Sequence, residues 1–229
     1  MKLVLTCEHA GNKIPNKYQH LFNKVKKVLN SHRGYDFGAY KLFNKLSPQS
    51  DFSKYTQISR LLIDCNRSLG NKNLYSENTK FLPKELKDEI YQNYYFPYRT
   101  KVENFINTNI EKEKIIHLSV HTFIPVLNGK IRNADVGILY DPKSIKEKFL
   151  AKKIKCAIRS FSPNLKIRYN YPYLGISDGF TTYLRNKYSY IKYKGIELEV
   201  NQKLFKNKKT INKIILSMQK FMIEMKKMN

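Results

Sequence analysis

The stretch that decides the fold is MKLVLTCEHAGNKIP, residues 1–15. Residues 3–6 form a short apolar run, which predicts a brief buried strand, and the glycine and proline that follow indicate a turn. The turn begins with Glu8 and His9, so the strand delivers polar side chains to the rim of a sheet. Proteins of the α/β class bind their ligands at this rim. A strand whose loop merely contains a histidine is the alternative that this stretch alone leaves open.

The rest of the chain alternates further apolar runs with segments of helical period. We expect strands at RLLIDC (60–65), IIHLSVH (115–121), DVGILY (135–140), LKIRYNYPY (165–173) and GIELEVN (195–201). We expect helices from about residue 35, over 83–106 with a break or kink at Pro97, over 142–158 and over 210–225. This alternation predicts a layered α/β domain.

Length and composition fit one ordinary globular domain. The 229 residues, of which 41% are hydrophobic and 27% charged, can bury one core, so we predict a single domain over 1–229. Cys7, Cys65 and Cys156 are odd in number and far apart, which argues against a disulfide framework and for a reducing compartment. No apolar run is long enough for a membrane span or a signal peptide. We therefore expect a cytoplasmic protein without a membrane partner, present as a monomer or small homo-oligomer.

The net charge is +25, from 43 Lys and Arg against 18 Asp and Glu. A basic surface suits nucleic acid, and the 17 tyrosines could stack on bases, so a basic nucleic-acid-binding protein is one function to weigh. The lysines are scattered among many Asn, Ile and Tyr, a mixture that an AT-rich coding sequence produces without selection for binding. No basic cluster or nucleic-acid motif stands out. Attraction for a small anionic substrate is compatible with either origin of the charge.

Two of the five histidines end apolar strands and are candidates for a metal site. His9 follows LVLTC and His121 closes IIHLSVH, so their imidazoles converge if the two strands are parallel neighbours. Zinc prefers such nitrogen donors joined by a carboxylate and water. His117 lies deeper in the same strand, where we expect a hydrogen-bonded core histidine. His20 and His32 lie in polar surroundings and are expected to be solvated.

Three carboxylates are candidates to complete the site. Asp36 stands at a predicted helix start, where it is either a metal ligand or a capping residue favoured by the helix dipole. Glu197 and Glu199 point to one face of an apolar strand, because side chains alternate with a period of two. Paired carboxylates buried on such a strand are costly unless they meet cations or a metal. We therefore expect at least one of the two glutamates to be functional.

Two further pairs of residues are candidates for substrate binding or catalysis. Asn66 and Arg67 follow an apolar run, and arginine presents a fork of donors that matches a carboxylate, although a surface salt bridge is the alternative for Arg67. Cys7 and His9 could instead form a nucleophilic pair. Cysteine is commonly a small buried residue, however, and a metal site explains His9 without it.

Taken in order, the strings CEHAGNKIP, YDFGA, RLLIDCNR, SVHTFIPVLNG, VGILYD, SDG and IELEVNQ resemble the N-formylglutamate amidohydrolase family. The matching strings extend from near the N-terminus to about Gln202 and cover most of the chain. The resemblance implies an α/β three-layer sandwich with a central mixed, mostly parallel sheet, of the zinc-dependent exopeptidase-like type. It also implies a zinc-dependent amidohydrolase of the N-formylglutamate deformylase type, with a role in histidine degradation.

The resemblance implies a set of metal ligands. Carried over to this sequence, His9, Asp36 and His121 would hold one Zn²⁺ ion or another divalent metal. Glu8, the acid of the first motif, is the alternative to Asp36 as the third ligand.

The resemblance also implies a substrate, N-formyl-L-glutamate, hydrolysed to formate and L-glutamate. Asn66 and Arg67 would hold the carboxylate of this small anionic N-acyl amino acid. Glu199 would be the catalytic acid/base, because it lies nearer the carboxyl end of its strand, and Glu197 would support it; the opposite assignment stays open. Another N-acyl amino acid or a peptide amide is the alternative substrate.

Overall fold

A computed structural model describes residues 1–227. The strands are β1 (Lys2–Cys7), β2 (Phe52–Tyr55), β3 (Ile115–Phe123), β4 (Val126–Leu127), β5 (Lys130–Ile131), β6 (Val136–Leu139), β7 (Ile167–Tyr169) and β8 (Tyr193–Asn201). The α-helices are α1 (Lys26–Leu29), α2 (Ala39–Leu46), α3 (Lys84–Ile90), α4 (Phe96–Ile110), α5 (Ile145–Phe161), α6 (Phe180–Lys187) and α7 (Lys208–Lys227). Short helical turns complete the list: η1 (Asn16–Val25), η2 (Ser47–Gln49), η3 (Tyr91–Tyr95) and η4 (Gln202–Lys206).

The main sheet has six strands in the order β2-β1-β3-β8-β6-β7. Strands β2, β1, β3 and β8 are parallel, β6 is antiparallel to β8, and β7 is parallel to β6. Strands β4 and β5 form a separate hairpin. The sheet is therefore mixed and mostly parallel, which confirms the predicted fold class.

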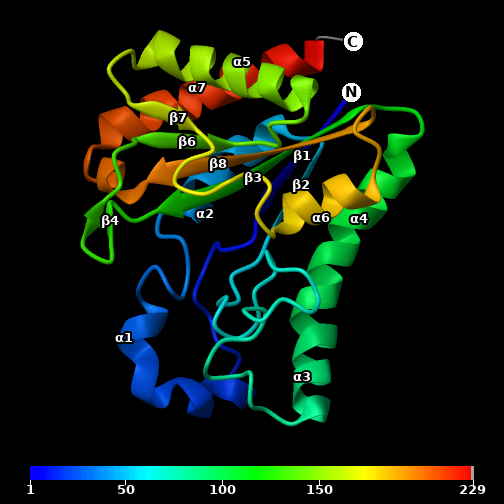
Figure 1. The fold of residues 1–229 in the computed structure, drawn as a ribbon, viewed down its shortest axis with the longest axis vertical. Coiled ribbons are helices and arrows are strands. Elements are labelled where there is room, and N and C mark those ends of the chain that lie inside the picture. Colours follow the sequence, from blue (N-terminus) through cyan, green and yellow to red (C-terminus); the bar gives the residue numbers. More distant parts are fainter. Residues whose placement is uncertain (228–229) are drawn as a thin grey trace.

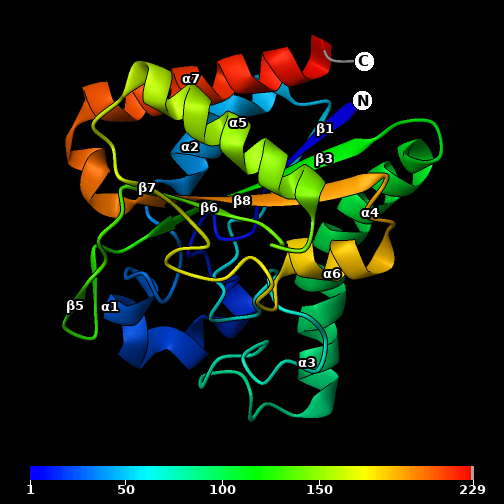
Figure 2. The same ribbon diagram turned by 45° about the horizontal axis from the view of Figure 1, so that its top comes forward.

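Helices cover both faces of this sheet, as Figure 1 shows. One core joins the sheet to α2, α5 and α7, and Figure 2 shows α5 and α7 side by side over that face. A second core joins the opposite face to α4, α6 and the loop around residues 61–65. The three layers follow from strands that are buried on both faces and therefore need helices on each.

The second face of the sheet changes from apolar to polar along the strands. On β3, Ile116, Leu118 and Val120 point into the first core, so the alternate residues His117 and His121 face the other way. Every residue of β3 and β8 is buried, polar ones included. The polar residues lie toward the carboxyl ends of the parallel strands, which is where ligands bind in such folds.

One expected strand is absent and another was missed. Residues 60–65 form turns and pair with no strand, because an apolar run this short packs equally well as a buried loop, here with Leu61, Leu62 and Ile63 in the second core. The neighbour of β1 is instead β2, whose sequence FSKY alternates between half-buried and exposed residues as an edge strand does.

The long helical segment contains a π-helical turn just before Pro97. Helix α3 continues through the π-helical turn η3 into α4, and Pro97 is the second residue of α4. The irregularity expected at Pro97 is therefore a π-helical turn just before it, and the chain stays helical on both sides. None of the described helices combines the length and the hydrophobicity that crossing a bilayer needs.

Candidate functional site

The candidate site lies where β1, β3 and β8 end. A cavity of about 230 Å³ opens there, and its lining includes His9, Asp36, His121 and Glu199. His9 follows β1, and His121 lies near the end of β3. Glu199, on β8, is the residue directly beside His121 in the pairing of β3 with β8. The expected parallel pairing of β1 with β3 thus places the two histidines together.

His9, Asp36 and His121 form a compact group. Asp36 Oδ2 lies 3.0 Å from His121 Nδ1 and 3.5 Å from His9 Nδ1, and the two ring centroids are 5.0 Å apart. One potential ligand atom from each residue lies within 4.8 Å of the other two. His9 Nδ1 is buried and has no hydrogen-bond partner among the described residues. The carboxylate of Asp36 faces the histidines and does not cap α2, so the capping role is not observed.

Each histidine contacts a buried carboxylate through its other ring nitrogen. His9 Nε2 lies 2.7 Å from Asp64 Oδ1, and His121 Nε2 lies 3.2 Å from Glu8 Oε2. Histidines that bind metals in proteins commonly donate their second N–H to a carboxylate, which fixes the orientation of the ring. Glu8 therefore contacts the nitrogen of His121 that does not contact Asp36.

The group concentrates buried negative charge. Burial opposes the charge on Asp36, but Arg60, paired with its Oδ1, and the two histidines hold the pKa of this carboxyl well below its usual range. Burial also opposes the charge on His121, yet hydrogen bonds to Asp36 and Glu8 raise the pKa of its imidazole well above the usual value. The surroundings thus stabilise positive charge between the two rings, and a divalent cation supplies such charge.

Glu199 has an unusual environment. It is 4% exposed, and its Oε2 is buried with no hydrogen-bond partner among the described residues. Burial raises the pKa of Glu199 to about 8, with His121 opposing the shift and the like charges of Asp36 and Glu197 adding to it. A carboxylate of this kind can accept a proton near neutral pH.

Glu197 lines the same cavity, as the alternation along β8 predicts. Its Oε1 accepts a hydrogen bond from the Thr181 hydroxyl at the start of α6. This oxygen is therefore already engaged, whereas Glu199 keeps an unpaired oxygen.

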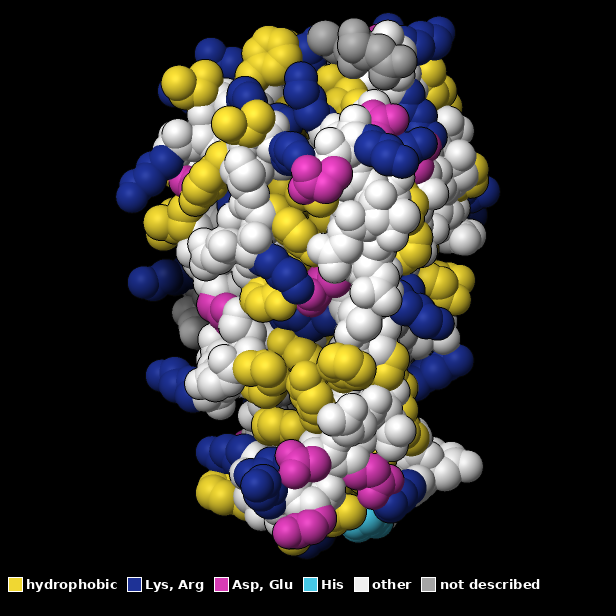
Figure 3. Space-filling view, turned by 90° about the vertical axis from the view of Figure 1, so that its right-hand side faces the viewer, with side chains coloured by type: hydrophobic (Ala, Val, Ile, Leu, Met, Phe, Trp, Pro, Cys, Tyr) yellow, Lys and Arg dark blue, Asp and Glu magenta, His cyan; other side chains and the backbone are white. Residues whose placement is uncertain are grey.

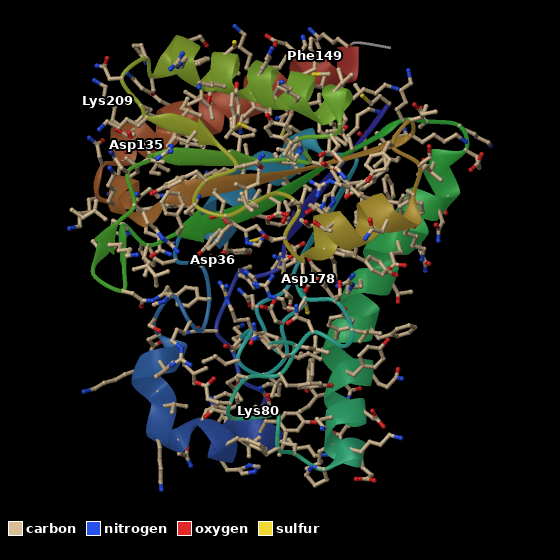
Figure 4. All side chains as sticks on the ribbon, in the orientation of Figure 1. Asp36, Lys80, Asp135, Phe149, Asp178 and Lys209 are labelled. Atoms are coloured by element: carbon tan, nitrogen blue, oxygen red, sulfur yellow. The ribbon has the colours of Figure 1, made fainter. Side chains whose placement is uncertain are left out.

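Asn66 and Arg67 also line the cavity. Phe180 donates its backbone N–H to Asn66 Oδ1 at 2.7 Å, so the amide nitrogen of Asn66 is the group available to a ligand. Arg67 donates to the backbone oxygen of Asp178, and its side chain is one-third exposed. Figure 4 shows Asp178 and Asp36 on the same side of the sheet, below the strands. Donors for an anionic group thus stand beside the His–Asp–His group.

Sequence reasoning missed Arg60 and Asp64. Both flank the buried run 61–63, and both are bound across the site, Arg60 to Asp36 and Asp64 to His9. The signal was available, because charged residues that directly border a fully buried run must be paired or solvated. Asp64 Oδ1 also accepts the backbone N–H of Asn66 at 2.9 Å and so shapes the turn that carries it.

The other histidines lie where the sequence predicts. His117 is fully buried and contacts the hydroxyls of Thr6 and Tyr193, each at 2.7 Å, so it is a satisfied core histidine. His20 and His32 are exposed.

Cys7 does not support a nucleophilic pair with His9. Its side chain belongs to the core against α2, α5 and α7, on the opposite face of the sheet from the cavity. Burial, with the nearby charge of Glu8, raises the pKa of its thiol well above the usual value, so it stays neutral.

Fold and site together define an α/β protein with a potential metal-binding group at the carboxyl ends of a mostly parallel sheet. The family model described as N-formylglutamate amidohydrolase matches residues 1–206, and the chain belongs to this family. Membership supports hydrolysis of an amide bond in a small substrate, which makes the chain an amidohydrolase.

Two solved structures share the fold over nearly the whole chain. The gene product Atu2144 of Agrobacterium tumefaciens has a TM-score of 0.81 and 27% sequence identity, covering 97% of this chain and 89% of its own. An N-formylglutamate amidohydrolase from Ralstonia eutropha JMP134 has a TM-score of 0.72 and 13% identity, covering 99% of this chain and 94% of its own. A comparison with curated proteins found no match.

Proposed function

We propose that this amidohydrolase holds a divalent metal ion, zinc by preference, between His9, Asp36 and His121, and hydrolyses N-formyl-L-glutamate. The observation that carries the proposal is the unpaired Nδ1 of His9, which faces the same Asp36 oxygen as His121 Nδ1. Two imidazole nitrogens and one carboxylate oxygen are the ligand types that catalytic zinc sites use. The contacts of Asp64 and Glu8 with the opposite ring nitrogens support the same assignment.

The proposed reaction assigns a separate task to each side chain. Zinc, when bound, supplies Lewis-acid chemistry, since it polarises a carbonyl oxygen and acidifies water. Glu199 takes a proton from the attacking water through its unpaired oxygen. As the new carbon–oxygen bond forms and the carbon–nitrogen bond breaks, Glu199 passes this proton to the departing amine, which yields formate and glutamate. Burial is the main cause of the raised pKa of Glu199, and the like charge of Glu197, which is held by Thr181, adds to it.

Asn66 and Arg67 orient the substrate in this proposal. They bind its α-carboxylate, which takes no part in bond breaking, and thereby fix the acyl carbon beside the His–Asp–His group. A cavity of about 230 Å³ suits a small N-acyl amino acid better than a long peptide.

The net charge of the chain does not by itself distinguish an enzyme from a nucleic-acid-binding protein. Lys and Arg side chains on the face that carries α4 are scattered among hydrophobic and acidic ones (Figure 3). Membership of a hydrolase family supports the enzyme. A cytoplasmic location and a role in histidine degradation stay predictions.

Formate release, measured beside metal content, tests the proposal. We expect the purified protein to contain about one divalent ion per chain and to release formate from N-formyl-L-glutamate faster than acetate from N-acetyl-L-glutamate. Faster hydrolysis of N-acetyl-L-glutamate or of a peptide amide would show that one of these alternatives is the substrate. Undiminished hydrolysis after complete removal of metal would overturn the metal-dependent mechanism.

A further inference from the structure

A buried cation lies behind the turn that carries Asn66. It is Arg99, which belongs to α4 and is only 4% exposed. Its Nη1 donates to the backbone oxygen of Arg67 at 2.9 Å and lies 3.5 Å from the backbone oxygen of Cys65. One guanidinium nitrogen therefore contacts the main chain on both sides of Asn66.

The same guanidinium is linked to the side chain of Asn66 through α6. Its central carbon lies 4.3 Å from the ring centroid of Phe180 and 4.2 Å from that of Tyr183, and both rings belong to α6. Phe180 in turn donates its backbone N–H to Asn66 Oδ1. Figure 1 shows α6 beside α4, and Arg99 joins the two helices at this turn. The backbone and the side chain of Asn66 thus both depend on one buried arginine.

No carboxylate of residues 1–227 forms an ion pair with this cation. Glu103, which lines a small neighbouring cavity together with Arg99, pairs with Lys187 instead. Arg99 Nη2 is buried and has no hydrogen-bond partner in this part of the chain, so carbonyl groups and ring faces are what stabilise the charge. Such partners offset the cost of burying a charge only in part.

Packing alone does not account for an arginine at this position. An apolar side chain would fill the space without the cost of desolvating a charge. What only the guanidinium provides is a donor for the carbonyl groups that flank Asn66. Tyr95, one helical turn before Arg99, donates to the same oxygen of Arg67 at 2.7 Å, so two side chains converge on the turn.

We propose that Arg99 is a positioning residue, which clamps the main chain beside Asn66 so that the amide nitrogen of Asn66 meets the substrate carboxylate. The inference rests on the proposed function, in which Asn66 binds that carboxylate. Asn66 lines the site cavity and Arg99 does not, so Arg99 acts through Asn66 and not on the substrate. A residue of this kind affects binding more than the chemical step, because the carboxylate takes no part in bond breaking.

A double-mutant cycle tests whether Arg99 acts through Asn66. Arg99→Met removes the charge and keeps an unbranched side chain, and Tyr95 still supplies a donor to the Arg67 carbonyl. We expect this variant to raise KM for N-formyl-L-glutamate about tenfold with little change in kcat. In an Asn66→Ala background the same substitution should raise KM less than about threefold, because the residue that it positions is already lost.

Two further variants separate positioning from general structural damage. Arg99→Lys keeps a cationic donor and should raise KM less than Arg99→Met does; it also carries the same cycle if the methionine variant fails to fold. Arg159→Met is the matched control, because Arg159 is an exposed arginine on α5, and it should leave KM unchanged. Equal rises in KM with and without Asn66, or a fall in kcat at unchanged KM, would overturn the inference.

A binding measurement separates this inference from the proposed function. Calorimetry with the metal-loaded protein measures the affinity for L-glutamate, the proposed product, which needs no turnover. We expect Arg99→Met to weaken binding in the wild type but not in Asn66→Ala. That result without any formate release would support the positioning role and refute the proposed function. Formate release combined with additive effects of the two substitutions would refute the positioning role and leave the proposed function standing.

Discussion

Replacing Glu8 with glutamine tests whether this carboxylate orients His121 or binds the metal itself. Glu8 Oε2 lies 3.2 Å from His121 Nε2 and accepts a hydrogen bond from Ser119 Oγ at 2.6 Å, while Tyr98 donates to Oε1 at 3.0 Å. Glutamine has the same shape but lacks the charge. A hydrogen bond to a charged group contributes about 1.5–3 kcal/mol, and loss of a carboxylate behind a metal-binding histidine typically lowers metal affinity about 10- to 100-fold.

The expected result for Glu8→Gln is therefore one zinc ion per chain, bound about 10- to 100-fold more weakly. The zinc dissociation constant is measured by competition with a chromophoric chelator. Glu111→Gln is the control, because Glu111 is exposed and pairs with Lys192 on the surface, and this variant should bind zinc as the wild type does. Loss of stoichiometric zinc, as we expect for His121→Ala, would show that Glu8 is a ligand. Wild-type affinity would show that it does not orient His121.

Three further predictions concern catalysis, substrate binding and stability. Glu199→Gln should lower kcat about 10³-fold at full metal content, measured by formate release with elemental analysis, and a fully active variant would remove Glu199 from the mechanism. Arg67→Lys should raise KM for N-formyl-L-glutamate at least about tenfold with little change in kcat, because lysine lacks the paired donors; an unchanged KM would count against its role. Burial lowers the pKa of His117 to about 4 against an ordinary value of 6.5, so the unfolded chain binds the proton first as the pH falls. The free energy of unfolding should therefore decline between pH 6.5 and pH 4, by up to about 3 kcal/mol more in the wild type than in His117→Gln. Urea denaturation across this range measures the difference, and equal slopes would contradict the assignment.

The sequence predicts those parts of the fold and the site that depend on hydrophobic periodicity and on which residues end a strand. Strand β1 contains a short apolar run, while β3 and β8 alternate apolar residues with polar ones, and the period of two along β8 correctly placed Glu197 and Glu199 on one face. His9 and His121 were found because each stands at the end of a predicted strand. These features are local, so one stretch of chain contains the whole signal.

The remainder depends on pairings between distant residues. The run at 60–65 is apolar enough for a strand, but its borders are fixed by the contacts of Arg60 with Asp36 and of Asp64 with His9, which lie 24 and 55 residues apart. Whether a buried charge is compensated is a property of the folded chain, and no periodic pattern records it. For the same reason Glu8 stayed open as the alternative to Asp36, and in the structure the two carboxylates contact different nitrogens of His121.

In the proposed site, two imidazoles and one aspartate share a single cation. Anomalous diffraction at the zinc absorption edge, from crystals of the zinc-loaded protein, tests it most directly. We expect one strong peak in contact with His9 Nδ1, His121 Nδ1 and an Asp36 carboxylate oxygen. Zinc bound elsewhere, with these three groups joined only by hydrogen bonds, would show that they are not its ligands.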